Sequence, residues 1–359
     1  MSKVRFFKYL FIFMLFIQYS GISQKKSDFS ATFTRWYNDK PGAISVTFDD
    51  ASYTQYEYAY PVLERYKIKA TFSLVGEWTH DNPSYSAEPG IFEIKKMGWR
   101  QIRELSRNGH EIAAHGYVHR KYGKRTNTDI LAEQMTKIKS LIESKLKKPV
   151  YTLHYPYSFT SDSIISAAKK AGFLFGRTQG TKKYNTPDSI DFYLLASRAI
   201  MNDTNPGIKE FVDWVNNTKD NWLILMYHHL FPKGSLEMNI MQNHNVINTY
   251  SLYPATFESQ MSILASSDYW IAPVAKTGKY IKERKHTKIK LRKHCRTIKI
   301  KTITDLDPEI YDHPLTVKVT LPWKRVRVKG SENDGIYKVV NNQLLVNVMP
   351  GKTVKIKKK

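Results

Sequence analysis

Cysteine is almost absent from this chain: Cys295 is the single one among 359 residues. One thiol excludes an intramolecular disulfide framework and a cysteine-rich zinc site. Acidic residues are also scarce, with 32 Asp+Glu against 56 Lys+Arg and a formal net charge of +24. The hydrophobic share of 42% is typical of a globular protein, and the length suits one barrel-sized domain with a smaller module beside it.

Long hydrophobic runs are missing as well, apart from a short one near the N-terminus. Basic residues precede the apolar run Tyr9–Ile17, and Gly21 and Ser23 have the spacing of a cleavage site. This pattern predicts a signal peptide over residues 1–23 and a secreted or periplasmic protein. The run is too short to span a bilayer comfortably, so a retained membrane anchor is the less favoured alternative. Secretion without disulfides is typical of a bacterial envelope protein.

The positive charge is concentrated at the C-terminal end. From Lys276 to Lys359 there are 23 basic and 7 acidic residues. Such a surface either attracts an anionic envelope polymer or is simply solvated, and the sequence leaves both interpretations open. The predicted secretion signal argues against nucleic acid as a partner, and no pattern indicates an obligate protein partner.

Strand and helix patterns alternate over the middle of the chain. The ranges with a strand pattern are Ala43–Phe48, Ala70–Val75, His110–His115, Val150–Tyr155, Phe173–Thr178, Tyr193–Met201, Trp222–His228 and Tyr269–Val274. The helical patterns between them are Tyr56–Tyr66, Trp99–Asn108, Asp129–Leu146, Ser161–Ala171, Ile208–Thr218 and Pro254–Ser266. Eight strands in this alternation predict an α/β fold, a distorted (β/α) barrel over residues 41–285 that follows a linker at 24–40.

The last part of the chain has a different pattern. Short β-branched, alternating stretches predict antiparallel strands at Thr297–Thr304, Leu315–Leu321, Val326–Val328, Gly335–Val340 and Leu344–Val348. We therefore expect a small basic β-rich, sandwich-like module over residues 286–359.

Two motifs at predicted strand ends point to a metal site. Asp49 and Asp50 follow one apolar run, and His115 follows another with His119 four residues later. A helical turn would place the two imidazoles on one face. Two histidines and one carboxylate form a ligand set with open metal positions, and the second carboxylate is then available as a base. Taken singly, the aspartates could instead cap a helix near Ser52, and the histidines could satisfy buried polar contacts.

These motifs, with Tyr155-Pro156-Tyr157 and Leu225-Met226-Tyr227-His228, resemble the ordered motifs of the polysaccharide deacetylases, the NodB-homology group of carbohydrate esterase family 4. The resemblance extends from about Ile44 to Arg284. It implies a divalent metal, usually Zn²⁺, bound by Asp50, His115 and His119, with Asp49 as general base.

The resemblance also assigns roles to residues nearer the end of the barrel. It implies that the backbone N–H of Tyr157 stabilises the oxyanion and that His228 protonates the leaving group, with the adjacent His229 as the alternative acid. The chain departs from the family pattern in two places: His154 stands where an arginine usually steadies the base, and Asp213-Trp214 is only a loose counterpart of the family's Asp–Trp motif. Arg177, at the end of the next predicted strand, could supply the missing guanidinium.

These observations predict a metal-dependent hydrolase that removes acetyl groups from a surface or dietary polysaccharide or oligosaccharide. N-acetyl groups are favoured over O-acetyl groups. The alternatives are an O-acetyl sugar esterase that uses the same site and a non-catalytic glycan-binding protein.

Overall fold

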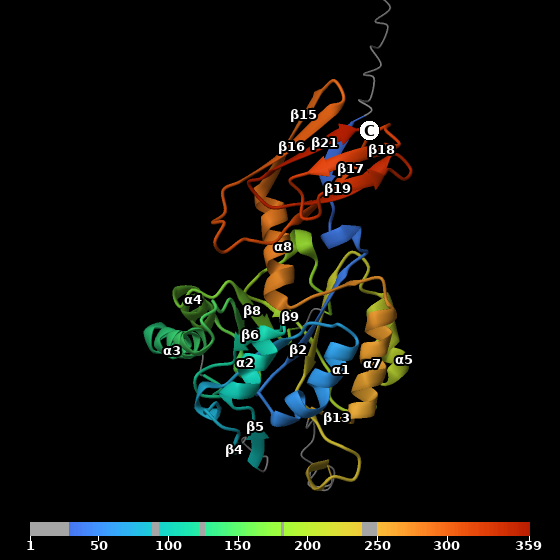
Figure 1. Cartoon of the computed structure of the whole chain (residues 1–359). Helices are drawn as coiled ribbons and strands as arrows, with labels where there is room; N and C mark the ends of the chain where they lie inside the picture. The colour runs from blue at the N-terminus through green and yellow to red at the C-terminus, as the bar shows by residue number, and fades with distance from the viewer. Residues whose placement is uncertain (1–28, 88–92, 123–125, 181–182, 239–249) are drawn as a thin grey trace, which may run out of the picture.

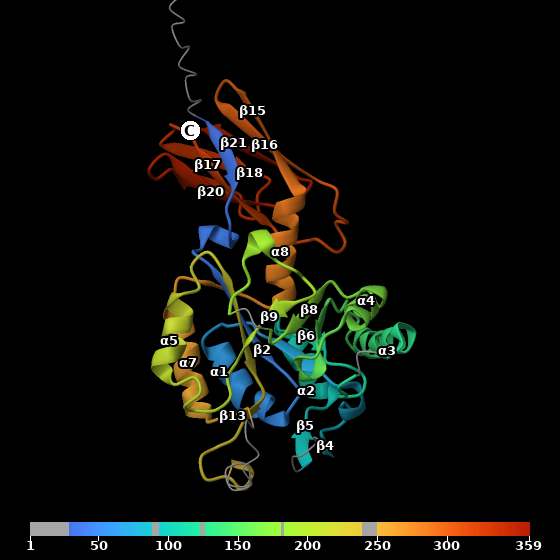
Figure 2. The ribbon, with the colours of Figure 1, turned by 180° about the vertical axis from the view of Figure 1, so that it is seen from behind.

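The computed structural model of this protein describes residues 29–87, 93–122, 126–180, 183–238 and 250–359. The chain forms a barrel of strands and helices with a β-sandwich stacked on one end of it (Figures 1 and 2). The predicted signal peptide lies outside the described residues. In the described part of the chain, no helix is both long enough and apolar enough to cross a membrane.

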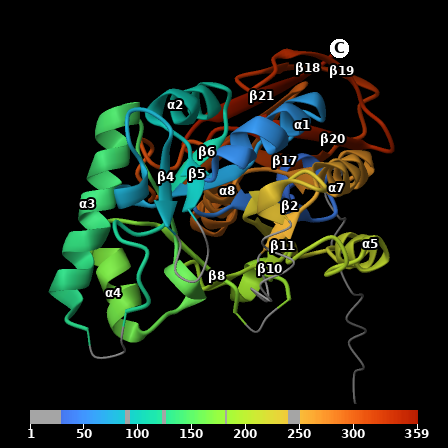
Figure 3. The same cartoon turned by 90° about the horizontal axis from the view of Figure 1, so that it is seen from below.

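The barrel is a parallel sheet in the order β10-β11-β2-β3-β6-β7-β8-β9, with β14 paired to β2 beside it. Its end strands are neighbours in the chain, so the sheet curls into the nearly closed (β/α) barrel that the sequence predicts (Figure 3). The strands are β2 (Ala43–Phe48), β3 (Thr71–Leu74), β6 (Glu111–Ala114), β7 (Thr152–His154), β8 (Phe175–Thr178), β9 (Leu195–Ala196), β10 (Arg198–Ala199), β11 (Trp222–Tyr227) and β14 (Trp270–Ile271).

One predicted strand, Tyr193–Met201, is broken into β9 and β10 at Ser197. The hydroxyl and backbone N–H of Ser197 both donate to the carbonyl of Thr178, which turns the chain at the end of β8. The prediction of one continuous strand was therefore wrong, because alternating apolar residues do not reveal such a side-chain bond.

Helices cover the outside of the barrel close to their predicted positions. They are α1 (Tyr60–Arg65), α2 (Trp99–Arg107), α3 (Thr128–Leu146), α4 (Asp162–Lys170), α5 (Ile208–Asn216), α7 (Pro254–Ser266) and α8 (Val274–His286). A π-helical turn, η2 (Gln55–Ala59), precedes α1, and short 3₁₀ turns lie at η1 (Tyr37–Asp39), η3 (Gly76–Trp78), η4 (Pro156–Ser158) and η5 (Pro187–Ser189). Side-chain caps fix two helix starts: Asn127 accepts from Asp129 N–H, and Ser161 accepts from Ile164 N–H.

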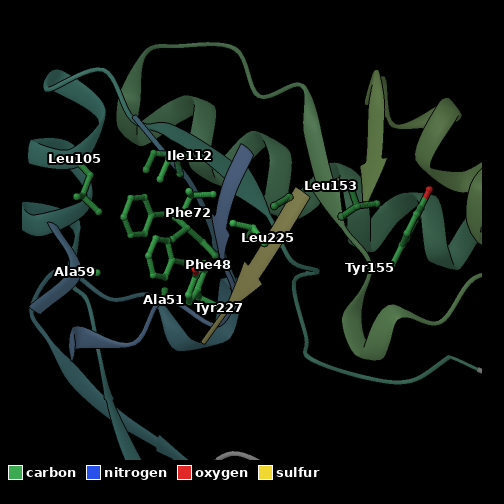
Figure 4. Close-up of a cluster of buried hydrophobic side chains, with 14 of the residues drawn as sticks. Phe48, Ala51, Ala59, Phe72, Leu105, Ile112, Leu153, Tyr155, Leu225 and Tyr227 are labelled. Atoms are coloured by element: carbon green, nitrogen blue, oxygen red, sulfur yellow. The ribbon is translucent and has the colours of Figure 1, made fainter. Parts of the chain in front are cut away.

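The core joins the barrel strands to the helices around them (Figure 4). The Phe48 and Phe72 rings stack with centroids 4.8 Å apart, and Tyr227 and Phe257 pack beside them. Each of these four side chains is at most 1% exposed. Burial of such rings stabilises the strand ends that carry the site, because each contributes about 2–3 kcal/mol relative to exposure.

The sandwich has two antiparallel sheets. One is β1-β17-β20 and the other is β15-β16-β21-β18-β19. Its strands are β1 (Ser30–Phe33), β15 (Thr287–His294), β16 (Thr297–Thr304), β17 (Leu315–Thr320), β18 (Arg325–Lys329), β19 (Gly335–Lys338), β20 (Gln343–Val348) and β21 (Thr353–Lys358). Aliphatic side chains from both sheets fill the space between them.

Three details of this module differ from the sequence-based prediction. The segment predicted as a linker supplies β1, which pairs with β17 and so belongs to the sandwich. β15 and β21 have strand structure although their sequences, rich in lysine, look like charge runs. The alternation of inward aliphatic residues with outward basic residues makes them amphipathic strands, a pattern that the charge obscures.

Additional short strands were not predicted. Two short strand pairs lie at the barrel end away from the sandwich (Figure 1). One is the hairpin of β4 (Ser84–Ala87) and β5 (Glu93–Lys96), and the other pairs β12 (His229–Leu230) with β13 (Ser251–Leu252). The sandwich therefore covers the N-terminal ends of the barrel strands, and their C-terminal ends face the other way.

Candidate metal centre and active site

Polar residues follow several neighbouring barrel strands at their C-terminal ends. Asp49 and Asp50 follow β2, His115 follows β6, and His228 follows β11, while His154 and Arg177 lie within the last residues of β7 and β8. The parallel register places these strand ends side by side, which is where barrel enzymes carry their sites.

The predicted metal ligands converge. Asp50, His115 and His119 each offer one ligand atom, and these atoms all lie within 4.8 Å of one another. Asp50 Oδ1 is 3.4 Å from His115 Nε2 and 3.6 Å from His119 Nε2. Asp50 and the next residue, Ala51, have φ of +71° and +52°, so the chain turns sharply here and returns the carboxylate over the barrel.

The loop between the two histidines is not the helical turn expected from their spacing. Residues 116–122 contain no helix, and Gly116 has φ of +83°. A Cβ at Gly116 would lie 2.9 Å from Val118 O, so this tight turn needs glycine. The turn still brings the two rings together, with centroids 4.9 Å apart.

Second contacts orient the ligands. His115 Nδ1–H donates to His154 O at 2.8 Å, so Nε2 is the ring nitrogen that faces Asp50. The His119 ring packs between Trp78 at 4.9 Å and Tyr157 at 4.5 Å. Asp50 Oδ1 is buried and makes no hydrogen bond to any described residue. A carboxylate oxygen without a donor, facing two imidazoles, fits a divalent cation.

Electrostatics keep this cluster charged. Burial would raise the pKa of Asp50, but His115 and His119 outweigh it and hold the pKa of Asp50 well below its usual range. Burial lowers the pKa of His115, but the carboxylates of Asp49 and Asp50 outweigh it and raise that pKa above its ordinary value. Asp50 therefore stays ionised and attracts positive charge, either a proton on His115 or a bound cation.

Asp49 is held by three donors. Ser73 Oγ donates to Asp49 Oδ1 at 2.9 Å, and His154 Nδ1–H donates to the same oxygen at 2.8 Å. The Arg177 guanidinium bonds to Asp49 Oδ2. Burial would raise the pKa of Asp49, but Arg177, His115 and His154 overcome it and keep the pKa far below its ordinary value.

Arg177 thus contacts the carboxylate of Asp49, as expected if it supplies the guanidinium that is missing at position 154. It is fully buried, and its other partner groups are Ser197 Oγ at 3.1 Å and Met226 Sδ. His154 is a second partner of Asp49. Burial and the nearby Arg177 lower the pKa of His154 to about 3, so its imidazole is neutral and its Nδ1–H serves as a donor.

The two adjacent histidines after β11 point to different surroundings. His228 Nε2 is 3.8 Å from Asp49 Oδ2 and 3.9 Å from Asp50 Oδ2. His229 lies in β12 and stacks on Phe231, with centroids 5.7 Å apart and planes at 23°. His228 is therefore the one that faces the carboxylates.

Tyr157 lies at the edge of the site. Its φ is +56°, and its side chain is 47% exposed while its ring contacts His119. An exposed ring beside a metal ligand offers a flat apolar surface to a sugar.

Sequence reasoning missed some neighbours of these residues. The Tyr250 ring stacks on His228 with centroids 4.5 Å apart, and Gln55 donates its amide N–H groups to the carbonyls of Asp49 and His228. Ser73 and Trp78 contact Asp49 and His119. None of the four belongs to a recognisable motif, and only their neighbourhood in the fold connects them to the site.

Comparison with known proteins agrees with the class that this barrel and its Asp/His cluster define. Residues 37–176 match the model of the polysaccharide deacetylase family. The resemblance predicted from the motifs is confirmed for this part of the chain. The matched region contains the aspartates, His115, His119 and Tyr157, whereas Arg177 and His228 lie beyond it.

Among individual proteins, the chain is 29% identical over 161 residues to the poly-beta-1,6-N-acetyl-D-glucosamine N-deacetylase of Staphylococcus aureus (strain MRSA252), covering 42% of this chain and 52% of that protein. The chain thus spans about half the length of this curated relative. Among solved structures, it is similar to a de-N-acetylase from Aggregatibacter actinomycetemcomitans (23% identity, 47% of this chain, 74% of that chain, TM-score 0.41). It is also similar to IcaB from Ammonifex degensii (21% identity, 45% of this chain, 69% of that chain, TM-score 0.39).

Proposed function

We propose that this protein is a metal-dependent N-deacetylase of a polymer of acetylated amino sugars. The observation that carries the proposal is the convergence of Asp50, His115 and His119 beside Asp49, whose carboxylate is held ionised by a buried guanidinium. The Staphylococcus aureus relative supports N-acetylglucosamine as the sugar class.

The chain's own residues suit amide hydrolysis. A divalent metal, with Zn²⁺ as the expected ion, would be held by Asp50, His115 and His119 and would supply Lewis acidity and a lowered pKa for water. The oxygen of the water adds to the acetyl carbon, and Asp49 accepts the proton that the water loses. Its Oδ2 is the oxygen nearest His228, so the proton acceptor and the predicted proton donor lie on the same side of the site.

The acid step falls to His228. Its Nε2 donates a proton to the nitrogen of the acetamide as the C–N bond breaks, which releases acetate and a free amine. Tyr250 stacks on the His228 ring and Gln55 binds its backbone carbonyl, so both hold the imidazole in place. The N–H of Tyr157 is proposed to stabilise the negative oxygen.

The complete ligand set argues against the alternative of a non-catalytic glycan-binding protein. An O-acetyl sugar esterase would use the same residues and differ only in the leaving group. We therefore propose incubating full-length protein and Zn²⁺ with β-1,6-linked N-acetylglucosamine oligomers and, separately, with O-acetylated sugars. Acetate and new amines from the first substrate support the proposal, and acetate from the ester alone would replace it with the esterase.

A matched variant tests whether this site does the work. His115→Ala should abolish acetate release, whereas His229→Gln, next to the site but facing Phe231, should leave most of it. Equal turnover by His115→Ala and the unchanged protein would refute the assignment.

A further inference from the structure

The two outer faces of the sandwich have very different charge. On the five-stranded sheet, exposed basic residues alternate with buried aliphatic ones, as in Arg325, Arg327 and Lys329 of β18. The five strands of this sheet contain no Asp or Glu. The outer face of the β1-β17-β20 sheet carries one basic side chain, Lys318, which is paired with Asp39. A general solubilising charge would not be confined to one face in this way.

The strand register aligns the charges in rows. Arg292 of β15 is opposite Lys299 of β16, Lys299 is opposite Lys355 of β21, and Lys355 is opposite Lys329 of β18. We call these four residues the basic row. Neighbouring strands lie about 4.8 Å apart, so each cation has another directly beside it. Like charges in opposed positions destabilise a sheet, so this arrangement needs a reason other than folding.

Nothing described in the protein neutralises the row. None of its four members forms an ion pair with a residue of the described ranges, and all four are exposed. The acidic residues of the module, such as Asp305 and Asp312, lie outside the strands and pair with His286 and Lys279 instead. The face is thus available to an external anion.

We infer that this face docks on an anionic lipid surface. The cations spread in two dimensions over the sheet, which suits a plane of phosphate headgroups better than the single track that a linear polymer follows. Two exposed isoleucines, Ile303 on β16 and Ile336 on β19, lie among the cations on the same face. Apolar side chains at a charged surface suit the boundary between headgroups and acyl chains better than a wholly polar polysaccharide.

The geometry leaves the active site accessible during docking. The sandwich covers the N-terminal ends of the barrel strands (Figures 1 and 2). The metal cluster lies at their C-terminal ends, because Asp50 and His115 follow β2 and β6. Docking therefore holds the barrel at the surface without covering the Asp/His cluster. This inference is independent of the proposed deacetylase activity and applies equally to a catalytically inactive chain.

The test compares two variants of the full chain on phospholipid vesicles by co-sedimentation. The first changes the basic row, Arg292, Lys299, Lys329 and Lys355, to Gln. The matched control changes four exposed lysines of the barrel to Gln: Lys67, Lys147, Lys209 and Lys219. Both variants lose four positive charges, so a difference between them in vesicle binding shows that the location of the charges matters. Neutral phosphatidylcholine vesicles give the baseline, and vesicles with added phosphatidylglycerol give the anionic surface.

We expect the unchanged protein and the control to bind anionic vesicles far more tightly than neutral ones, and to lose this preference at 1 M salt, where screening acts over about 3 Å. Removal of the basic row should weaken anionic binding on the order of 10³-fold, since each of its four basic residues contributes about fivefold near the surface. The melting temperature of the basic-row variant should equal or exceed that of the unchanged protein, because the substitution removes repulsion between neighbouring cations.

Three results would overturn the inference. One is equal weakening by the two variants, and another is equal binding to neutral and anionic vesicles. The third is tight binding to a soluble acidic polysaccharide such as alginate without any preference for anionic vesicles, which would assign the face to a polymer instead. Activity on a soluble acetylated oligomer should not change in the basic-row variant, which separates failure of docking from failure of catalysis.

Discussion

The contact between Arg177 and Asp49 makes the sharpest prediction. The guanidinium is 0% exposed and Asp49 is 2% exposed, so neither charge is screened by solvent. Two unit charges about 4 Å apart interact by about 4 kcal/mol at an effective dielectric constant of 20. Arg177→Met keeps a long apolar side chain but leaves the carboxylate without its cation. We expect a loss of about 3–5 kcal/mol in the free energy of unfolding, because the remaining charge is buried and uncompensated.

A double-mutant cycle separates lost charge from lost packing. Asp49→Asn combined with Arg177→Met removes both charges, so the double variant should recover most of the stability that the single change loses. Urea unfolding followed by tryptophan fluorescence gives the four free energies. An additive double variant, as unstable as the sum of the singles, would refute the claim that Arg177 acts through the charge of Asp49. In turnover, Arg177→Met should lower kcat with little change in KM, as expected of a positioning residue.

Further predictions concern the base, the acid and a buried carboxyl group. Asp49→Asn should lower turnover about 10²–10⁴-fold, measured as acetate release, and full activity would mean that another residue is the base. His228→Gln should lower kcat about 10²–10⁴-fold while His229→Gln has little effect, and the reverse order would exchange their roles. Burial raises the pKa of Glu283 from 4.5 to about 7, so the folded chain binds this proton more tightly than the unfolded chain. The contribution of Glu283 to the free energy of unfolding is therefore complete below about pH 4.5, and about 3 kcal/mol of it is lost as the pH rises through 7. Glu283→Gln should reduce this loss in unfolding curves measured at several pH values. The same pH dependence in the variant and the unchanged protein would contradict the prediction.

The regular part of the barrel could be predicted because its signals are local. The strand at Ala43–Phe48 is continuous, mostly apolar and fully buried. Helix α7 has the range predicted from its pattern, Pro254–Ser266. In a layered α/β fold, a short buried run of this kind forms an inner parallel strand, and a run with helical periodicity forms an outer helix.

The parts that failed depend on distant partners. β1 forms only because β17, almost 300 residues later, offers it an edge. β21 has a lysine-rich sequence, and only its pairing with both β16 and β18 shows that it is a central strand. Pairing across such separations has no local signature, so composition and periodicity describe these segments as linker and tail.

The candidate site divides in the same way. Spacing and strand-end position indicate His115, His119 and one of the two aspartates, and the family resemblance selects Asp50. The loop between the histidines is nevertheless a glycine turn rather than a helix. Tyr250 could not be proposed, because its place on His228 depends on the pairing of β12 with β13. Motifs identify groups that carry chemistry, whereas the residues that hold them in position are found only in the fold.

Metal binding tests the central claim most directly. Full-length protein, stripped of metal and titrated with Zn²⁺ by calorimetry, should bind one ion per chain at the Asp50, His115 and His119 cluster. Asp49→Asn should keep this binding, and His119→Ala should lose it while its melting curve shows that the chain is folded. Binding that is the same in His119→Ala as in the unchanged protein, or no Zn²⁺ binding by the unchanged protein, would contradict the assignment of this cluster as the metal centre.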